Sequence, residues 1–297
     1  MRLPIVAGAF LEAVWLMDGT GRPLNFHVRK LVRELIRLRQ EAGLIQKDVF
    51  RTTRMTPSKM SRFEVGIQVP KFLETQALLD LYGVPVCDWK YYQDIRDRAA
   101  EKPWWEGKGL QDVALISDEH EARVVRDVQL MYLPVLLRTE AYARRLLETT
   151  SPSLDDERLA MELEACVRRG KVLDGDDPVY LHALIYQPVL QSGVDVEQLR
   201  HLRDLAARPN VTVQIITHPT DPRSDMKTSF TLVSFPDKED PDVAYTEGLV
   251  GPAQTEDAKQ VGALRSTFEN LVKFAMSPEE SLTHLNILLE RARDEAP

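Results

Sequence analysis

A pair of short helical segments separated by a sharp turn, at residues 46–51 and 57–63, constrains the fold of this chain more than any other feature of its sequence. The second helix is predicted to begin after Thr56, because threonine is a good N-cap and Pro57 fits the first helical position. Two helices joined this closely are typical of a helix-turn-helix.

Further helices are predicted on both sides of this pair, at residues 28–41, 72–81 and 88–101. Apolar residues recur at helical spacing in these segments, and Gly43 can end the first of them with a left-handed cap. Met60 and Phe63 are expected to point into a common core. The five helices together predict one small all-α helix-turn-helix domain at residues 25–102.

Residues 1–24 are expected to form a poorly ordered extension. Residues 1–17 faintly resemble a secretory signal, but Glu12 interrupts the apolar run and no cleavage site of small residues follows it. No other stretch is apolar enough to span a bilayer. Cys87 and Cys166 match no metal or redox spacing, which favours a reducing compartment, so we expect a cytoplasmic protein.

Charge is unevenly distributed along the chain. The 297 residues carry a net charge of −8, yet residues 22–66 hold eleven lysines and arginines against four acids. That segment therefore carries +7 and the remainder −15. A basic segment joined to an acidic remainder is typical of a phosphate-binding module attached to a domain that nucleic acid repels. The alternative is a charged helix face that is merely solvated.

We predict that the polar face of the helix pair contacts double-stranded DNA through Gln46, Thr56, Pro57, Ser58, Lys59, Ser61 and Arg62. Lys59 is the leading candidate for a guanine or phosphate contact, and Arg62 is the next. In the alternative interpretation Arg62 pairs with Glu64 or Glu34 and never reaches DNA. One such helix covers only a few base pairs, so we also expect a homodimer that places two of them on half-sites about 34 Å apart.

A second domain of the α+β class is predicted at residues 103–297, after a boundary rich in tryptophan and glycine. Its helices are predicted at residues 118–131, 139–148, 155–171, 195–208, 256–276 and 279–293. Its strands are predicted at residues 179–185, 211–217, 229–235 and 243–246, and the spacing of the last three indicates a small antiparallel sheet. Trp104 and Trp105 are expected to pack between the domains, with a ligand-stacking role as the alternative.

Residues 28–83 resemble the Xre-type, lambda-repressor-like helix-turn-helix, in the pattern Ala42-Gly-Leu-x-Gln46 and in Ser58-Lys-Met-Ser-Arg-Phe-Glu64. Segments of the second half resemble the C-terminal domain of a large actinobacterial regulator family, at residues 104–105, 133–143, 209–214, 229–236, 240–248 and 276–280. The resemblance implies an antitoxin-like transcriptional regulator. Members of that family are often encoded beside a small companion protein, which it implies as a partner.

Three residues depart from the helix-turn-helix pattern of that family. Ile45 stands where a capping threonine is usual, which removes a contribution of about 1 kcal/mol. Phe50 replaces an alanine where the two helices approach each other. Arg54 replaces the glycine of the turn and is expected to adopt a strained positive φ, at a cost of about 1 kcal/mol or more. Together these changes leave open the alternative that the helix-turn-helix binds DNA more weakly or in an altered way.

Signals for catalysis are weak. The six histidines show no metal-binding spacing, and no nucleophile elbow, phosphate loop or dinucleotide turn is present. Glu247, an acid at a strand end beside glycine, is a minor candidate for a partner or ligand contact, and a structural hydrogen bond is the simpler interpretation. We therefore expect no catalytic residue, no metal and no cofactor.

The sequence predicts a DNA-binding transcriptional regulator whose C-terminal domain binds a partner protein or ligand and dimerises. The first alternative is an antitoxin-like interaction scaffold whose helix-turn-helix has weakened. The second is an enzyme with an unrecognised site.

Overall fold

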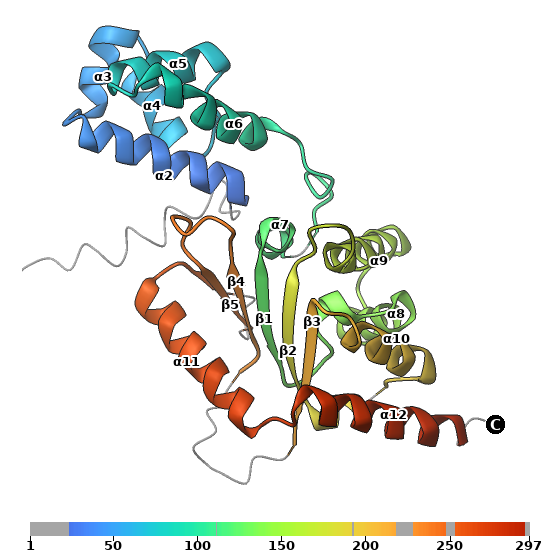
Figure 1. The fold of residues 1–297 in the computed structure, drawn as a ribbon. Coiled ribbons are helices and arrows are strands. Elements are labelled where there is room, and N and C mark those ends of the chain that lie inside the picture. Colours follow the sequence, from blue (N-terminus) through green and yellow to red (C-terminus); the bar gives the residue numbers. More distant parts are fainter. Residues whose placement is uncertain (1–23, 111, 192, 218–227, 248–252, 295–297) are drawn as a thin grey trace, which may run out of the picture. The chain divides into compact units, whose positions relative to one another are not determined.

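The computed structural model describes residues 24–110, 112–191, 193–217, 228–247 and 253–294 (Figure 1). The chain forms two compact units, residues 1–106 and residues 107–297. The signal-like segment and residues 1–23 of the predicted extension lie outside the described residues, whereas Leu24 is described and is buried in the core of the first unit. Among the helices that are described, none is long and apolar enough to cross a lipid bilayer.

The first unit is entirely helical. Its helices are α2 (Phe26–Glu41), α3 (Gln46–Thr53), α4 (Pro57–Glu64), α5 (Phe72–Leu81) and α6 (Trp89–Ala100), with a 3₁₀ turn, η1, at Val86–Asp88. Local sequence sets their ends: the Asn25 side chain accepts a hydrogen bond from the Val28 amide at 2.9 Å, and Gly43 follows α2 with a φ of +68°. The predicted helices of this region agree with these bounds to within about two residues.

One apolar core holds these five helices together. Leu35 of α2, Val49 of α3 and Leu78 of α5 are all 1% exposed or less. Met60 and Phe63 of α4 join them, at 0% and 1%, which confirms that these two side chains point inward. Because one side of α4 is anchored in this way, its opposite side must face solvent.

The second unit is built on a six-stranded sheet. Its strands are β1 (Val124–Gln129), β2 (Tyr180–Tyr186), β3 (Val211–Ile216), β4 (Phe230–Ser234), β5 (Val243–Thr246) and β6 (Ala253–Thr255). They lie in the order β3-β2-β1-β4-β5-β6. Strands β1, β2 and β3 are parallel, and β4, β5 and β6 continue the sheet by antiparallel pairing.

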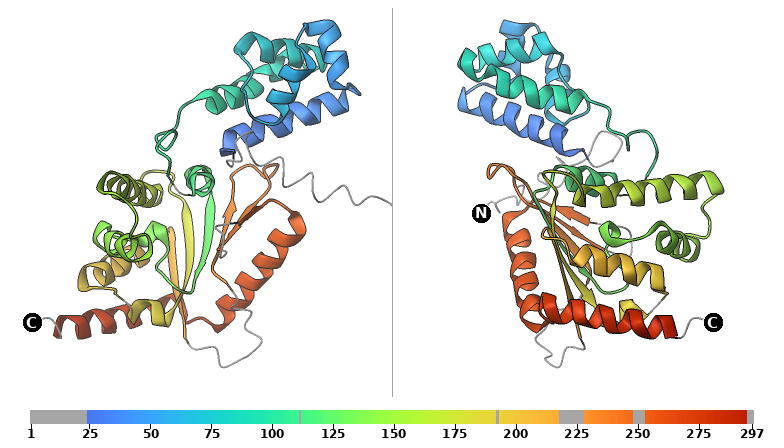
Figure 2. Two further views of the ribbon diagram at one scale, coloured as in Figure 1. Left: turned by 180° about the vertical axis from the view of Figure 1, so that it is seen from behind. Right: turned by 45° about the vertical axis from the view of Figure 1, so that its right-hand side comes forward.

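Helices cover both faces of this sheet (Figures 1 and 2). They are α7 (Val113–Glu121), α8 (Glu140–Thr150), α9 (Asp156–Gly170), α10 (Val196–Ala206), α11 (Ala258–Phe274) and α12 (Pro278–Asp294), with 3₁₀ turns η2 (Val135–Leu137), η3 (Lys171–Leu173) and η4 (Gln187–Gln191). Leu202 of α10 and Leu285 of α12 pack with Val125 on one face, whereas Phe268 of α11 packs with Val128 on the other. The unit is therefore a three-layer α+β domain.

The prediction of a small antiparallel sheet is wrong in both size and strand direction. The strand predicted at residues 211–217 is present as β3, but it lies beside β2 at the sheet edge, not beside β4. The reason is its connection: β3 follows β2 through helix α10, and a helical crossover returns the chain parallel to the previous strand. Only the β4–β5 pair has the predicted hairpin arrangement.

The predicted helix at residues 118–131 is also wrong. Helix α7 ends at Glu121, and β1 begins at Val124 in the centre of the sheet, paired on both sides. Its β-branched residues are compatible with a strand, and pairing with β2 and β4 overrides the helical pattern of the charged residues before it. The three-residue strand β6 was not predicted.

Candidate nucleic-acid interface

The turn between α3 and α4 is tight and depends on one left-handed residue. Arg54 follows α3 with a φ of 62°, which confirms the positive φ expected at this position. Its amide donates to the Phe50 carbonyl at 3.0 Å and closes the last turn of α3. Thr56 then caps α4, since its hydroxyl accepts from the Lys59 amide at 3.3 Å, and Pro57 occupies the first helical position.

The solvent-facing side of α4 consists of small polar groups and one cation. Pro57, Ser58, Ser61 and Arg62 are exposed, and so is Thr56 at the cap. These positions recur at i, i+1, i+4 and i+5, so they form a single strip along the helix. We refer to Thr56, Pro57, Ser58, Ser61 and Arg62 as the α4 strip. Five of the seven predicted DNA contacts therefore lie together.

A buried ion pair fixes α4 against the first two helices. The Arg39 guanidinium donates from Nε to Glu64 Oε1 at 2.6 Å and from Nη2 to Oε2 at 3.0 Å. The two side chains are 13% and 3% exposed. The hydrogen bonds that Arg39 donates to Glu64 raise the pKa of Arg39 despite its burial. Arg39 also donates to the Leu44 carbonyl at 2.8 Å, so it joins α2, the turn before α3, and α4.

Gln46, a predicted DNA contact, is part of this arrangement. Its side-chain amide donates to Glu64 Oε2 at 2.9 Å. This bond holds the side chain against the end of α4. Arg62 is exposed, and the two acids considered as its partners pair with other arginines, Glu64 with Arg39 and Glu34 with Arg37.

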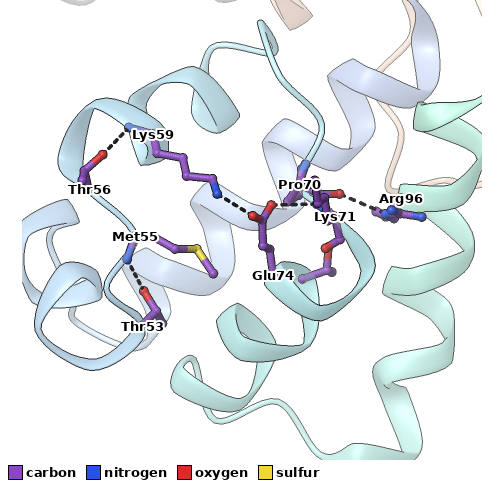
Figure 3. A network of polar contacts seen from close by, with 9 residues as sticks. Thr53, Met55, Thr56, Lys59, Pro70, Lys71, Glu74 and Arg96 are labelled. Carbon is purple, nitrogen blue, oxygen red and sulfur yellow. Dashed lines mark hydrogen bonds and ion pairs between the residues drawn. The ribbon is translucent and has the colours of Figure 1, made fainter.

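Lys59 is not part of the α4 strip, because its side chain extends toward Glu74 (Figure 3). Its ammonium forms an ion pair with Glu74 of α5, and Glu74 also accepts from the Lys71 amide at 2.8 Å. Burial alone would raise the pKa of Glu74, but the hydrogen bonds from Lys59 and Lys71 outweigh it and lower this pKa. A contact between Lys59 and DNA would require this pair to break, so Arg62 is the better-placed cation of α4.

The remaining departures from the family pattern are accommodated locally. Ile45 caps α3 without a side-chain acceptor, and its amide donates instead to the Asp48 carboxylate at 3.1 Å. Phe50 is 39% exposed, so a large part of this residue faces solvent.

The three weaker candidates lie elsewhere. Trp105 is buried and meets Trp104 edge to face, with ring centroids 5.3 Å apart. Glu247 is exposed, its amide donates to the Ser229 carbonyl at 3.3 Å, and its carbonyl accepts from the Thr228 hydroxyl at 3.2 Å. In the described part of the chain, no group of three or more histidine, cysteine, aspartate or glutamate residues is arranged to bind a metal ion.

The α3–turn–α4 unit with its outward strip defines a helix-turn-helix protein. Comparison with known families agrees, because the model of a helix-turn-helix domain matches residues 30–88. A second model, that of a domain of unknown function (DUF5753), matches residues 113–286, more than half of the chain. The chain belongs to the DUF5753 family. No curated protein and no solved structure matches it.

Proposed function

We propose that this protein is a transcriptional regulator that binds duplex DNA with the α4 strip in the major groove. The observation that carries the proposal is the exposure of this strip opposite an anchored apolar face. A recognition helix needs both properties, since its inner face fixes its direction and its outer face reaches base edges and phosphates.

Charge supports the same docking. Residues 22–66 carry +7, whereas the rest of the chain carries −15. Phosphates attract the first segment and repel the second, so the protein approaches DNA with its helical domain. Arg62 is the residue of the strip that can donate two hydrogen bonds to guanine or phosphate, and Ser58 and Ser61 can add single bonds to phosphate.

The C-terminal α+β domain is proposed as the input and dimerisation domain. Pairing two strips on adjacent half-sites would raise the discrimination that one short helix provides. The resemblance to Xre-type, antitoxin-like regulators supports this role and supports a small companion protein as the partner. The proposal assigns no reaction to the chain.

The test is selection of DNA from a random duplex library by the full chain, followed by fluorescence anisotropy over a range of salt concentrations. Arg62→Ala should weaken binding of the selected duplex by about 5- to 150-fold, the loss of roughly 1–3 kcal/mol, and reduce the salt slope by about one. Lys90→Ala, an exposed lysine of α6, is the matched control and should change neither quantity. No enrichment of any duplex, or equal effects of the two substitutions, would refute this docking.

A second function is favoured by the apolar exposure near the turn. Ile45 is 59% exposed, and Phe50 is 39% exposed on the next turn of α3. Such side chains suit a protein contact better than a phosphate contact, which favours an interaction scaffold with a weakened DNA reader. If the library selection yields no duplex while the protein still captures its companion, this second function is the correct one.

A further inference from the structure

Helix α9 binds the segment that begins the second unit, directly after the boundary between residues 106 and 107. The Arg158 guanidinium donates from Nη1 to the Lys108 carbonyl at 2.7 Å and from Nη2 to the Gly109 carbonyl at 2.6 Å. The Lys108 ammonium also pairs with Glu164 of α9 at 3.2 Å. One arginine side chain therefore holds two consecutive carbonyls, and we refer to Arg158, Lys108 and Gly109 as the junction clamp.

The backbone of this segment leaves room for the arginine. Gly107 and Gly109 both have a positive φ, of 74° and 63°, which favours glycine at either position. A Cβ on Gly109 would lie 2.7 Å from Arg158 Nη1, whereas a Cβ on Gly107 would meet no atom within 4 Å. A side chain at position 109 would therefore displace the guanidinium, and one at position 107 would not.

The helix that carries Arg158 is fixed within the second unit. At its start, the Arg158 amide donates to the capping Asp155 carboxylate at 2.8 Å. In its middle, Leu163 is 3% exposed in an apolar cluster shared with α8. Near its end, Arg169 donates to both carboxylate oxygens of Glu119 on α7, at 2.7 and 2.9 Å. The junction clamp therefore ties residues 108 and 109 to a well-anchored helix.

The clamp determines where the chain becomes fixed to the second unit. The first buried residue after the clamp is Leu110, at 7% exposed. If the clamp opens, residues 107–109 are added to the connection that leads from the first unit. Three extended residues span roughly 10 Å, so opening the clamp lengthens the connection by up to that amount.

We propose that the junction clamp is a conformational device that shortens the connection between the two units and so limits how far the helix-turn-helix unit moves relative to the second unit. As a control on DNA binding this inference rests on the proposed function. The experiments below use no DNA, so failure of the clamp and failure of DNA binding are separate results.

The first measurement is the rate at which trypsin cleaves the full chain after Lys108, read by mass spectrometry. Cleavage requires local opening, which the clamp opposes. Arg158→Met keeps most of the apolar stem but removes the donors, so it should raise this rate at least about tenfold. Arg144→Met, at an exposed arginine of α8 that pairs with Glu140, is the control and should leave the rate unchanged.

Gly109→Ala opens the clamp while Arg158 itself is retained. Its matched control is Gly107→Ala, which places alanine at a similar positive φ but makes no contact with Arg158. Cleavage after Lys108 should be at least about fivefold faster in Gly109→Ala than in Gly107→Ala. Each rate is divided by that of a free peptide with the same sequence, which removes the effect of the substitution on trypsin itself.

The second measurement is the distribution of distances between the units, by pulsed electron paramagnetic resonance. One nitroxide label is placed on Cys87, which is exposed, and the other on Asn286→Cys, an exposed position of α12. The labelled chain is diluted with unlabelled protein, so that each distance lies within one chain. Arg158→Met and Gly109→Ala should broaden the distribution, whereas their two controls should not.

A purely local role of Arg158 in stability would leave the width of this distribution unchanged. The proposal is overturned if cleavage after Lys108 is as slow in a folded Arg158→Met protein as in the original, or if the distance distribution keeps its width. If Arg158→Met does not fold, the comparison of Gly109→Ala with Gly107→Ala decides both measurements.

Discussion

Replacing Arg39 by methionine tests whether the buried ion pair orients the helix-turn-helix. Arg39 makes two hydrogen bonds to Glu64 and one to the Leu44 carbonyl, and the Glu64 side chain is only 3% exposed. Methionine keeps most of the apolar stem but removes the charge. Glu64 would then be a buried carboxylate whose remaining side-chain donor is the Gln46 amide.

Its expected cost follows from that burial. Removing one partner of a buried pair destabilises a protein by roughly 3–5 kcal/mol, because the other charge stays uncompensated. A domain of this size has a total stability of roughly 4–12 kcal/mol. We therefore expect Arg39→Met to remove a large part of the stability of the first unit. Adding Glu64→Met should recover at least about 2 kcal/mol, since an apolar pair of similar volume carries no desolvation cost.

The matched control is Arg37→Met on the same helix. Arg37 bonds Glu34 at 2.6 Å and Glu41 at 2.9 Å, but its side chain is 47% exposed. Exposed pairs contribute about 0–1 kcal/mol, so this variant should be nearly as stable as the original. Hydrogen–deuterium exchange read by mass spectrometry on the full chain measures the opening free energy of α2, α3 and α4 separately from the second unit.

Two results would contradict this reasoning. Equal effects of Arg39→Met and Arg37→Met would mean that burial does not distinguish the two pairs. A double variant as unstable as the sum of the Arg39 and Glu64 single variants would mean that the two side chains are not energetically coupled.

Three further predictions concern single residues. Burial raises the pKa of Asp127 from 3.8 to about 6, so its contribution to stability falls by about 3 kcal/mol in all, of which about 2 kcal/mol is lost as pH rises from about 4 to 6. Asp127→Asn should lack this fall, and melting curves of both proteins across that range would check it; parallel curves would refute it. Arg54→Gly should raise the unfolding free energy by up to about 1 kcal/mol, because glycine adopts a φ of 62° without strain, and Arg54→Val should lower it; denaturant titrations giving the opposite order would refute it. Cys87 is exposed, whereas burial raises the pKa of the Cys166 thiol, so a thiol reagent should modify Cys87 rapidly and Cys166 only after unfolding; mass spectrometry showing equal labelling would refute this.

Local sequence was enough to predict the first unit. Asn25, Thr56 and Pro57 mark helix starts, and the i, i+3, i+4 spacing of apolar residues identifies the inward face of each helix. The positive φ of Arg54 could also be expected, because the turn geometry leaves its residue few alternatives. These features depend on neighbours within about one helical turn.

Contacts between distant residues decided the rest. The sequence predicts Lys59 as the leading DNA contact, but Glu74 on α5 is placed so that Lys59 forms an ion pair with it. Arg39 and Glu64 are 25 positions apart, and no local pattern links them. The sequence pattern predicts a helix over residues 118–131, but pairing with β2 and β4 makes residues 124–129 the central strand β1. The order of strands in the sheet and the pairing of buried charges depend on the free energy of the whole packed domain. They therefore cannot be predicted from local sequence patterns alone.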